Sequence, residues 1–259
     1  MGPPPLHEGY PEMHRGQVVT YPMSFVSKKG VKTPMTESNA EFDPRLADFA
    51  DNPEPRCPCI LLLDTSGSMV GKAIDQLNAG LQAFRDSLQQ DKLASLRVEI
   101  AMITFGSHAN LVQDFLTADQ FNPTALAAGG STPMGAAINL ALDKLEERKR
   151  LYKQTGTPYF RPWVFLITDG EPTDEWQTAA KRVQESESRK ALAFFAVGVE
   201  QADMSRLAQI SPRERPPKPL IGLEFKSLFL WLSRSLTNVS HSKVGDQVPL
   251  EPVDGWTKV

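Results

Sequence analysis

Short apolar runs alternate with longer segments of helical periodicity from Pro58 onward, and this alternation constrains the fold more than any other feature of the chain. Parallel strands need a long crossover between them, and that crossover is usually a helix. The alternation therefore predicts an α/β fold in which helices cover both faces of a mostly parallel sheet. We expect six strands, at residues 59–64, 97–105, 111–115, 163–168, 192–199 and 220–224.

Helical periodicity marks the longer segments. In the first helix, apolar side chains recur every three or four residues, so that one stripe faces the sheet. The second helix is expected to begin at Pro133, because the fixed φ of proline suits the first helical position. The other helices are expected at about residues 175–190, 203–210 and 225–239. The apolar stripe of the first helix of the chain consists of Ile74, Leu77, Leu81, Phe84 and Leu88.

The composition divides the chain into three regions. Residues 1–45 are rich in proline, glycine and polar residues, which predicts a flexible N-terminal arm. Residues 46–240 form the expected folded domain, and residues 241–259 the expected irregular C-terminal tail.

The chain shows no signal for export or membrane insertion. Its amino terminus lacks the basic start and apolar core of a secretory signal, and no apolar run approaches the length of a membrane span. We therefore expect a cytoplasmic protein with no membrane partner. The net charge of -3 offers no general attraction for nucleic acid, so we expect no nucleic-acid partner either.

The two cysteines, Cys57 and Cys59, are separated by a single proline. This spacing is a poor frame for an intrachain disulfide. No other cysteine occurs and the four histidines are scattered, so the sequence also argues against a zinc site.

Oxygen-bearing side chains gather in three of the predicted loops. Asp64, Ser66 and Ser68 alternate directly after the first strand, Thr132 precedes the second helix, and Asp169 follows the fourth strand. Ligands bind outside the carboxyl ends of the strands in open α/β sheets, so we expect these side chains to form one site. Hard oxygen donors favour a divalent cation such as Mg²⁺, with Mn²⁺ and Ca²⁺ as alternatives, over zinc or copper.

These three motifs, in this order, resemble the metal-ion-dependent adhesion site (MIDAS) of von Willebrand factor A (VWA) domains. The resemblance covers about residues 57–240 and implies a Rossmann-like three-layer sandwich, with a six-stranded sheet and one short antiparallel edge strand. It also implies a protein-interaction module, in which an Asp or Glu of a partner protein completes the metal shell. The implied metal ligands are Asp64, Ser66, Ser68, Thr132 and Asp169.

The residues around the motifs are similar to the bacterial cytosolic branch of the family typified by tellurium-resistance (TerY/YegL-like) proteins. The similarity lies in residues 64–69, 132–135 and 168–176. Members of that branch are often encoded beside a kinase and a phosphatase. The resemblance therefore implies bacterial stress-response, tellurium-resistance or phage-defence signalling, with a Ser/Thr kinase and a PP2C-type phosphatase as partners.

Two enzymatic alternatives fit less well. The segment from Gly67 to Lys72 opens a helix after a strand, but a phosphate-binding loop needs four residues between its glycines and Ser or Thr after the lysine, where Ala73 stands. A metal-dependent phosphotransferase or NTPase-type enzyme with Asp64 as nucleophile would usually carry a second carboxylate two residues later, where Ser66 stands. The sequence thus favours a binding module over an enzyme.

Several polar and aromatic residues have structural interpretations. His108 is expected in a solvent-facing turn, Asp174 as a helix cap and Trp176 as a packing residue. A basic run at the end of the second helix is interpreted as a solvated face, because cations near a helix carboxyl terminus interact favourably with the helix dipole. That run consists of Arg148, Lys149, Arg150 and Lys153.

Overall fold

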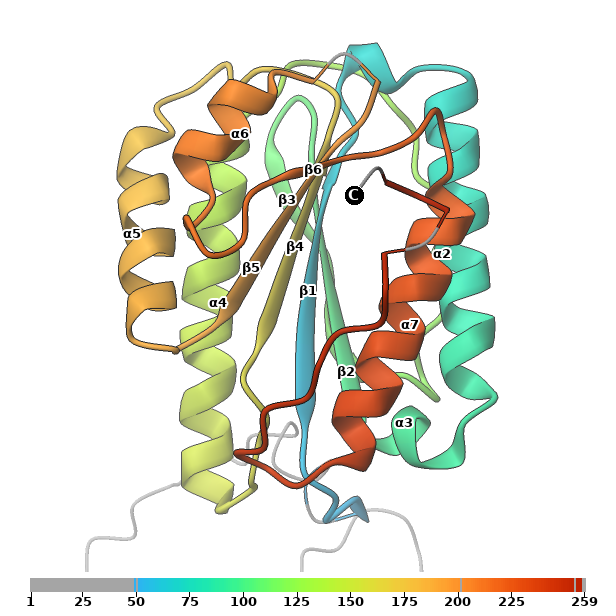
Figure 1. The fold of residues 1–259 in the computed structure, drawn as a ribbon, viewed down its shortest axis with the longest axis vertical. Helices are drawn as coiled ribbons and strands as arrows, with labels where there is room; N and C mark the ends of the chain where they lie inside the picture. The colour runs from blue at the N-terminus through green and yellow to red at the C-terminus, as the bar shows by residue number, and fades with distance from the viewer. Residues whose placement is uncertain (1–48, 50, 201, 254, 258–259) are drawn as a thin grey trace, which may run out of the picture. The chain divides into compact units, whose positions relative to one another are not determined.

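The fold was obtained as a computed structural model, which describes Phe49 and residues 51–200, 202–253 and 255–257 (Figure 1). The arm predicted at residues 1–45 lies outside the described residues. In chain order the elements are β1 (Cys57–Asp64), the 3-10 helix η2 (Gly67–Met69), α2 (Lys72–Gln89), α3 (Lys92–Arg97), β2 (Val98–Phe105), β3 (Ala109–Thr117), α4 (Met134–Thr155), β4 (Trp163–Thr168), α5 (Gln177–Ser188), β5 (Ala193–Gly198), α6 (Met204–Ile210), β6 (Lys218–Pro219) and α7 (Phe225–His241).

Six strands form one sheet in the order β3-β2-β1-β4-β5-β6. The central strand β1 pairs in parallel with β2 and β4, β5 pairs in parallel with β4 and β6, and β3 runs antiparallel to β2. The predicted α/β fold with a six-stranded, mostly parallel sheet is therefore confirmed.

Helices cover both faces of the sheet, as Figure 1 shows. Side chains of β1 alternate between two apolar cores: Cys59 and Leu61 point to the core that contains α2 and α7, while Ile60 and Leu62 point to the core that contains α4, α5 and α6. This alternation follows from the two-residue period of a strand, and it explains why β1 is apolar on both faces. Cys57 and Cys59 are free, buried thiols.

Two strands differ most from the prediction. The antiparallel edge strand expected at residues 111–115 is nine residues long rather than short, because a tight turn after β2 lets pairing start at Phe105 and Ala109. The last strand was predicted at 220–224, which is wrong. β6 has only two residues, Lys218 and Pro219, since prolines on both sides of Lys218 lack the N–H that a longer ladder needs.

The basic run of α4 is only partly solvated, so that prediction is wrong for two of its members. Arg150 and Lys153 are exposed, but Arg148 and Lys149 are 7% and 6% exposed. Arg148 points to the sheet because a carboxylate, Glu99 of β2, lies buried on the face that α4 covers.

A buried charge cluster forms around Glu99. Arg148 donates to both of its oxygens, at 2.9 and 2.6 Å, and the Tyr152 hydroxyl donates to Oε2. The Nε atom of Arg56 lies 2.9 Å from Oε1. One carboxylate therefore compensates two buried guanidinium groups, both from segments far from Glu99 in the sequence.

Residues 242–253 and 255–257 contain no helix or strand, yet part of this tail packs against the domain. Trp256 is 2% exposed and its carbonyl oxygen accepts a hydrogen bond from the N–H of Ile221 at 2.8 Å. The indole N–H of Trp231 donates to the carbonyl oxygen of Glu251 at 2.8 Å. The tail thus packs against α7 through Glu251 and against the segment after β6 through Trp256.

Glu99→Gln should lower the free energy of unfolding by about 3 to 5 kcal/mol, because it leaves two buried arginines without a compensating charge. Urea unfolding followed by circular dichroism measures the change. Asp143→Asn is the control, since it breaks an exposed pair with Arg182 and should cost less than about 1 kcal/mol. Equal stability of the two variants would contradict a structural role for the cluster.

Candidate metal centre

The predicted oxygen ligands lie at the end of the sheet where η2 begins, at the top of Figure 1. β1 lies between β2 and β4 in the sheet. After β1 the chain forms β2 on one side of β1, and it later forms β4 on the other side of β1. Loops on the two sides of such a strand diverge, which opens a crevice at its carboxyl end. Asp64 ends β1, and Asp169 follows the last residue of β4.

Both carboxylate oxygens of Asp64 accept hydrogen bonds. The backbone N–H of Ser66 donates to Oδ1 at 2.8 Å, and the Thr168 hydroxyl donates to Oδ2 at 2.5 Å. Burial raises the pKa of Asp64, the hydrogen bonds from Ser66 and Thr168 lower it, and the charge of Asp169 raises it, with a net shift upward. A cation bound beside Asp64 would favour its ionised form.

Thr168 had no predicted role beyond ending the fourth strand. Its hydroxyl fixes the orientation of the Asp64 carboxylate, and it also accepts a hydrogen bond from the N–H of Gly170 at 3.1 Å. A signal was present in the sequence, because Thr168 is the single polar residue of an otherwise apolar strand and stands at its carboxyl end. The signal was weak, since a threonine there also suits an ordinary strand end.

A chain of hydroxyls joins two of the loops. The Oγ atoms of Ser66 and Ser68 lie 3.0 Å apart, and the Ser68 hydroxyl donates to Oδ1 of Asp169 at 2.7 Å. The backbone supports this arrangement, because the N–H of Gly67 donates to the carbonyl oxygen of Gly130 at 3.0 Å. The structure therefore brings together side chains that are about a hundred residues apart in the sequence.

Thr132 lies beside the same crevice. Its backbone N–H donates to the Thr173 hydroxyl at 3.1 Å, and the N–H of Thr173 donates back to the Thr132 carbonyl oxygen at 2.9 Å. A Cβ on Gly170 would lie 3.1 Å from Oγ1 of Thr132 and 3.7 Å from Oδ2 of Asp64. Both oxygens thus border the space that the missing side chain of Gly170 leaves open.

The start of α4 differs from the prediction. Pro133 precedes the helix rather than occupying its first position, and the helix begins at Met134. Asp174 is a cap, but of α4 and not of the helix that follows it: its carboxylate accepts hydrogen bonds from the N–H groups of Gly135 at 2.9 Å and Ala136 at 2.8 Å. This pairing joins the loop after β4 to the loop before α4.

Two further interpretations are confirmed. His108 is exposed in the turn between β2 and β3. Trp176 is 8% exposed in the core beneath α4 and α5, and the guanidinium of Arg206 lies 5.2 Å from the centre of its ring.

The charge of the crevice fits a divalent cation. Asp64, Ser66 and Thr132 are buried, Asp169 is half-buried and Ser68 is exposed, so the donors lead from the interior to solvent. Within the described residues, neither Asp64 nor Asp169 forms an ion pair with Lys, Arg or His. Two uncompensated carboxylates with neutral hydroxyls match the oxygen shell of a hard divalent ion.

A zinc site of the thiolate or imidazole type does not fit the same crevice. Over the described part of the chain, no group of three or more His, Cys, Asp and Glu side chains could hold a metal ion. The assignment of Asp64, Ser66, Ser68, Thr132 and Asp169 as ligands rests on oxygen chemistry alone and stays a prediction.

No helix among the described residues is long and apolar enough to cross a bilayer.

Known proteins share this architecture. A curated relative, a von Willebrand factor A domain-containing protein of Dictyostelium discoideum, is 28% identical over 131 residues, which is 50% of this chain and 13% of that protein. The chain therefore spans a small part of that relative.

Solved structures with the same fold include proximal thread matrix protein 1 of the mussel byssus, at 15% identity and a TM-score of 0.51, covering 71% of this chain and 48% of that one. The pilus adhesin SpaC of Lactobacillus rhamnosus GG gives a TM-score of 0.57 at 14% identity, covering 71% of this chain and 30% of its own. These likenesses concern the fold.

The family profile of the von Willebrand factor type A domain matches residues 59–219, which include every predicted metal ligand. With this match over more than half of its length, the chain belongs to the von Willebrand factor type A domain family.

Proposed function

We propose that this protein is a divalent-metal-dependent protein-interaction module. A metal ion, with Mg²⁺ as the expected ion, would be held by Asp64, Ser66, Ser68, Thr132 and Asp169, and an Asp or Glu of a partner protein would complete its shell. When bound, the ion supplies a positive centre that attracts a carboxylate. The residues of this chain would hold the ion between the buried Asp64 and the exposed Ser68.

One observation carries the proposal: two carboxylates that have no cationic partner among the described residues meet neutral hydroxyls at the switch point of the sheet. Because the hydroxyls add no charge, a bound divalent ion remains able to attract a further anion. Ser68 is exposed and Asp169 half-buried, so a partner side chain can approach from solvent. Asp64 and Thr168 form the buried floor.

A relative supports the metal part of the proposal. Another structure of the mussel proximal thread matrix protein 1 is described as having a zinc-occupied MIDAS motif, and its fold likeness to this chain has a TM-score of 0.50 at 15% identity. Zinc in that protein makes the choice of metal a question for measurement. The all-oxygen donor set of this chain favours magnesium or manganese over zinc.

The cellular role belongs to the same proposal. We infer a cytoplasmic protein of a bacterial stress-response, tellurium-resistance or phage-defence signalling system, with a Ser/Thr kinase and a PP2C-type phosphatase as partners. The similarity of residues 132–135 and 168–176 to tellurium-resistance proteins supports this role. Affinity purification from a bacterial host, with and without chelator, tests it.

The proposal is of a binding module and not of an enzyme. The alternative is a metal-dependent phosphotransferase or NTPase-type enzyme that uses the Asp64 loop. Metal-dependent ATP hydrolysis by the purified protein, lost in Asp64→Ala, would establish that alternative.

Asp64→Ala should abolish binding of Mg²⁺ and Mn²⁺ because it removes one of the two uncompensated carboxylates. Isothermal titration calorimetry of the full chain should show one site in the unmodified protein and none in the variant. Glu171→Ala, which removes an exposed carboxylate close to Asp169, is the matched control and should bind normally. Zinc that binds far more tightly and is unaffected by Asp64→Ala would contradict the ligand assignment.

Thr168→Val should weaken metal binding by about tenfold without removing a predicted ligand, because Asp64 loses the hydroxyl that orients it. Valine keeps the shape of threonine in a buried strand. The same calorimetric titration measures the loss, and thermal unfolding checks that the fold is kept. Unchanged affinity in a folded variant would show that Thr168 has only a packing role.

Thr132→Ala should keep the fold, with a change in the free energy of unfolding of less than about 1 kcal/mol, because Asp174 and not Thr132 caps α4. Thr132→Ala and Asp169→Ala should each abolish the part of partner capture that EDTA removes from the unmodified protein. Ser131→Ala, in the same loop, is the control. Full partner recovery by both variants and by EDTA-treated protein would refute the adhesion mechanism.

A further inference from the structure

A second candidate binding site lies on the side of the sheet, away from the crevice at the strand ends. α2 and α7 pack together on one face, but over the described part of the chain no separate helix covers the part of that face formed by β4 and β5. The C-terminal tail covers it instead, through Val253 and Trp256. Because β6 is only two residues long, a cavity of about 280 Å³ remains between β5, α7 and the tail.

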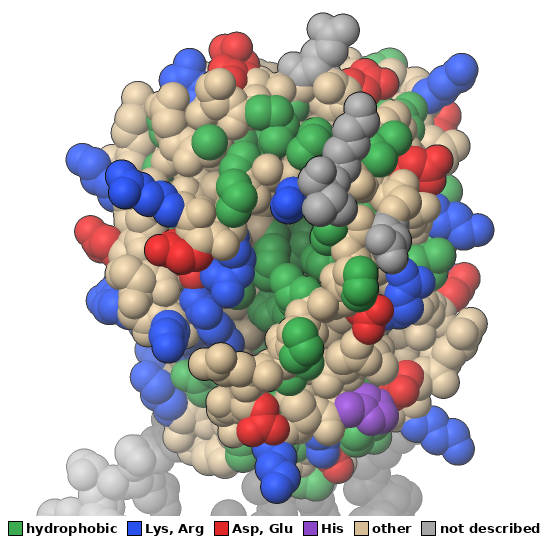
Figure 2. Space-filling view, viewed as in Figure 1, with side chains coloured by type: hydrophobic (Ala, Val, Ile, Leu, Met, Phe, Trp, Pro, Cys, Tyr) green, Lys and Arg blue, Asp and Glu red, His purple; other side chains and the backbone are tan. Residues whose placement is uncertain are grey.

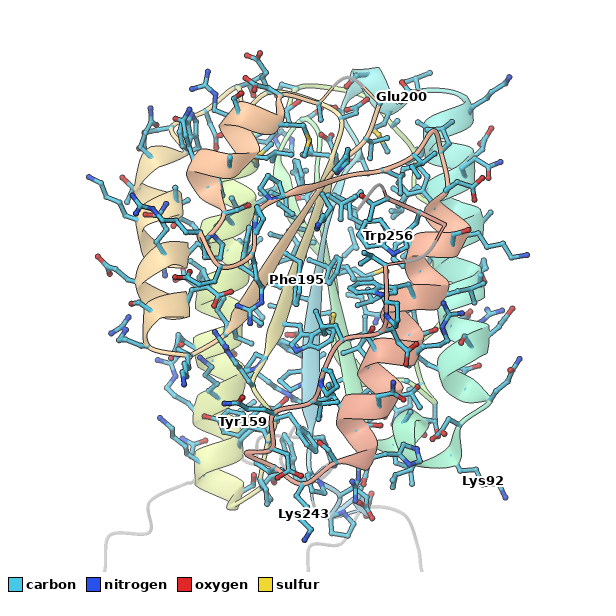
Figure 3. The ribbon with its side chains drawn as sticks, viewed as in Figure 1. Lys92, Tyr159, Phe195, Glu200, Lys243 and Trp256 are labelled. Carbon is cyan, nitrogen blue, oxygen red and sulfur yellow. The ribbon has the colours of Figure 1, made fainter. Side chains whose placement is uncertain are left out.

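Four of the residues that line the cavity are aromatic. Phe165 and Phe195 stack with ring centres 4.8 Å apart, Phe165 lies 6.1 Å from Trp231, and Trp231 lies 5.2 Å from Trp256. Figure 3 shows Phe195 on the side of the sheet and Trp256 on the side of α7. Val197, Leu250 and Val253 add aliphatic side chains to this lining.

Positive charge borders the cavity. Lys218 lines it, and no carboxylate of the described residues lies within 4.0 Å of its ammonium group. Arg215 also lines it and shares a single carboxylate, Glu187, with Arg161, at 2.8 and 2.5 Å respectively. The two guanidinium groups therefore share one carboxylate, while the only lining carboxylate among the described residues belongs to the exposed Glu214.

The surface shows both properties together. Figure 2 shows a hollow with an apolar floor in this part of the molecule, with Lys and Arg side chains gathered along one side. Leu250, 40% exposed, stands at its rim. Ligand sites in proteins commonly combine a mainly apolar, aromatic wall with a few polar groups that fix orientation.

We propose that this cavity binds a small apolar monocarboxylate, a medium-length hydrocarbon chain or an aromatic ring that carries one carboxylate. The apolar body packs against Phe165, Phe195 and Trp231, and the carboxylate faces Lys218 and Arg215. The volume of about 280 Å³ admits a body of this size. The positive border disfavours cationic ligands, although aromatic walls alone would accept them.

Octanoate is the probe for the hydrocarbon form of the ligand and 1-naphthoate for the aromatic form. Isothermal titration calorimetry of the full chain measures affinity, and tryptophan fluorescence reports on Trp231 and Trp256. Octanol and octylammonium have the same chain without the negative charge. At least one of the two carboxylates should bind saturably. The affinities for octanol and octylammonium should be lower by about tenfold or more.

Two variants locate the carboxylate without altering the core. Lys218→Met keeps an apolar stem but removes the charge. It should lower the affinity for the carboxylate ligand about tenfold and leave the affinity for octanol unchanged. Leu250→Glu places a negative charge at the exposed rim and should also lower the affinity for the carboxylate ligand. Lys226→Met, on an exposed position of α7 outside the cavity, is the matched control and should have no effect.

The result is separable from the metal site, because Asp64→Ala should lose metal but retain full carboxylate affinity. The proposal is overturned if neither carboxylate binds at millimolar concentration, if octanol or octylammonium binds as tightly, or if Lys218→Met and Leu250→Glu leave the affinity unchanged. Binding that is lost in Asp64→Ala would also overturn it, since the carboxylate would then be a ligand of the metal.

Discussion

The complete burial of β1 is the constraint on which the rest of the structure depends. All eight residues from Cys57 to Asp64 are buried, and neighbouring strands pair with both edges. A strand in this position needs an apolar layer on each face, which α2 and α7 supply on one side and α4 with α5 on the other. Its terminal carboxylate must also find partners where water is excluded. Ser66 and Thr168 satisfy it, and their positions define the crevice.

Several hydrogen bonds that hold the crevice do not use the side-chain oxygen atoms of the predicted ligands. Backbone bonds tie Gly67 to Gly130, and the Asp174 carboxylate ties the loop after β4 to the start of α4. The frame can therefore keep its shape when a ligand side chain is changed. The charges of the two places also differ. Among the described residues, the carboxylates of the crevice have no cationic partner, whereas Lys218 beside the side cavity has no carboxylate within 4.0 Å. The two proposed ligands therefore have opposite charges and different places on the domain.

Much of the fold follows from local pattern. The fourth strand was predicted at residues 163–168 and occupies that range, because a short apolar run bounded by loops has few alternatives. The loops that carry Asp64 and Asp169 could be placed for the same reason, since each directly follows such a strand. Predictions were weaker where proline competes with strand pairing, as at Pro219, or where a hydroxyl has two plausible roles, as at Thr168.

By itself, the sequence determined the order of the six strands and of the five longer helical segments, but not α3, and it placed the three loops that bear oxygen donors, because periodicity and turn residues act over short distances. Tertiary structure decided which side chains meet. Arg148 is buried because Glu99, 49 residues away, lies opposite it, and Asp64 is oriented by Thr168, 104 residues away. The environment of a polar side chain depends on partners brought by the fold, so a solvated face and a buried ion pair have the same local sequence.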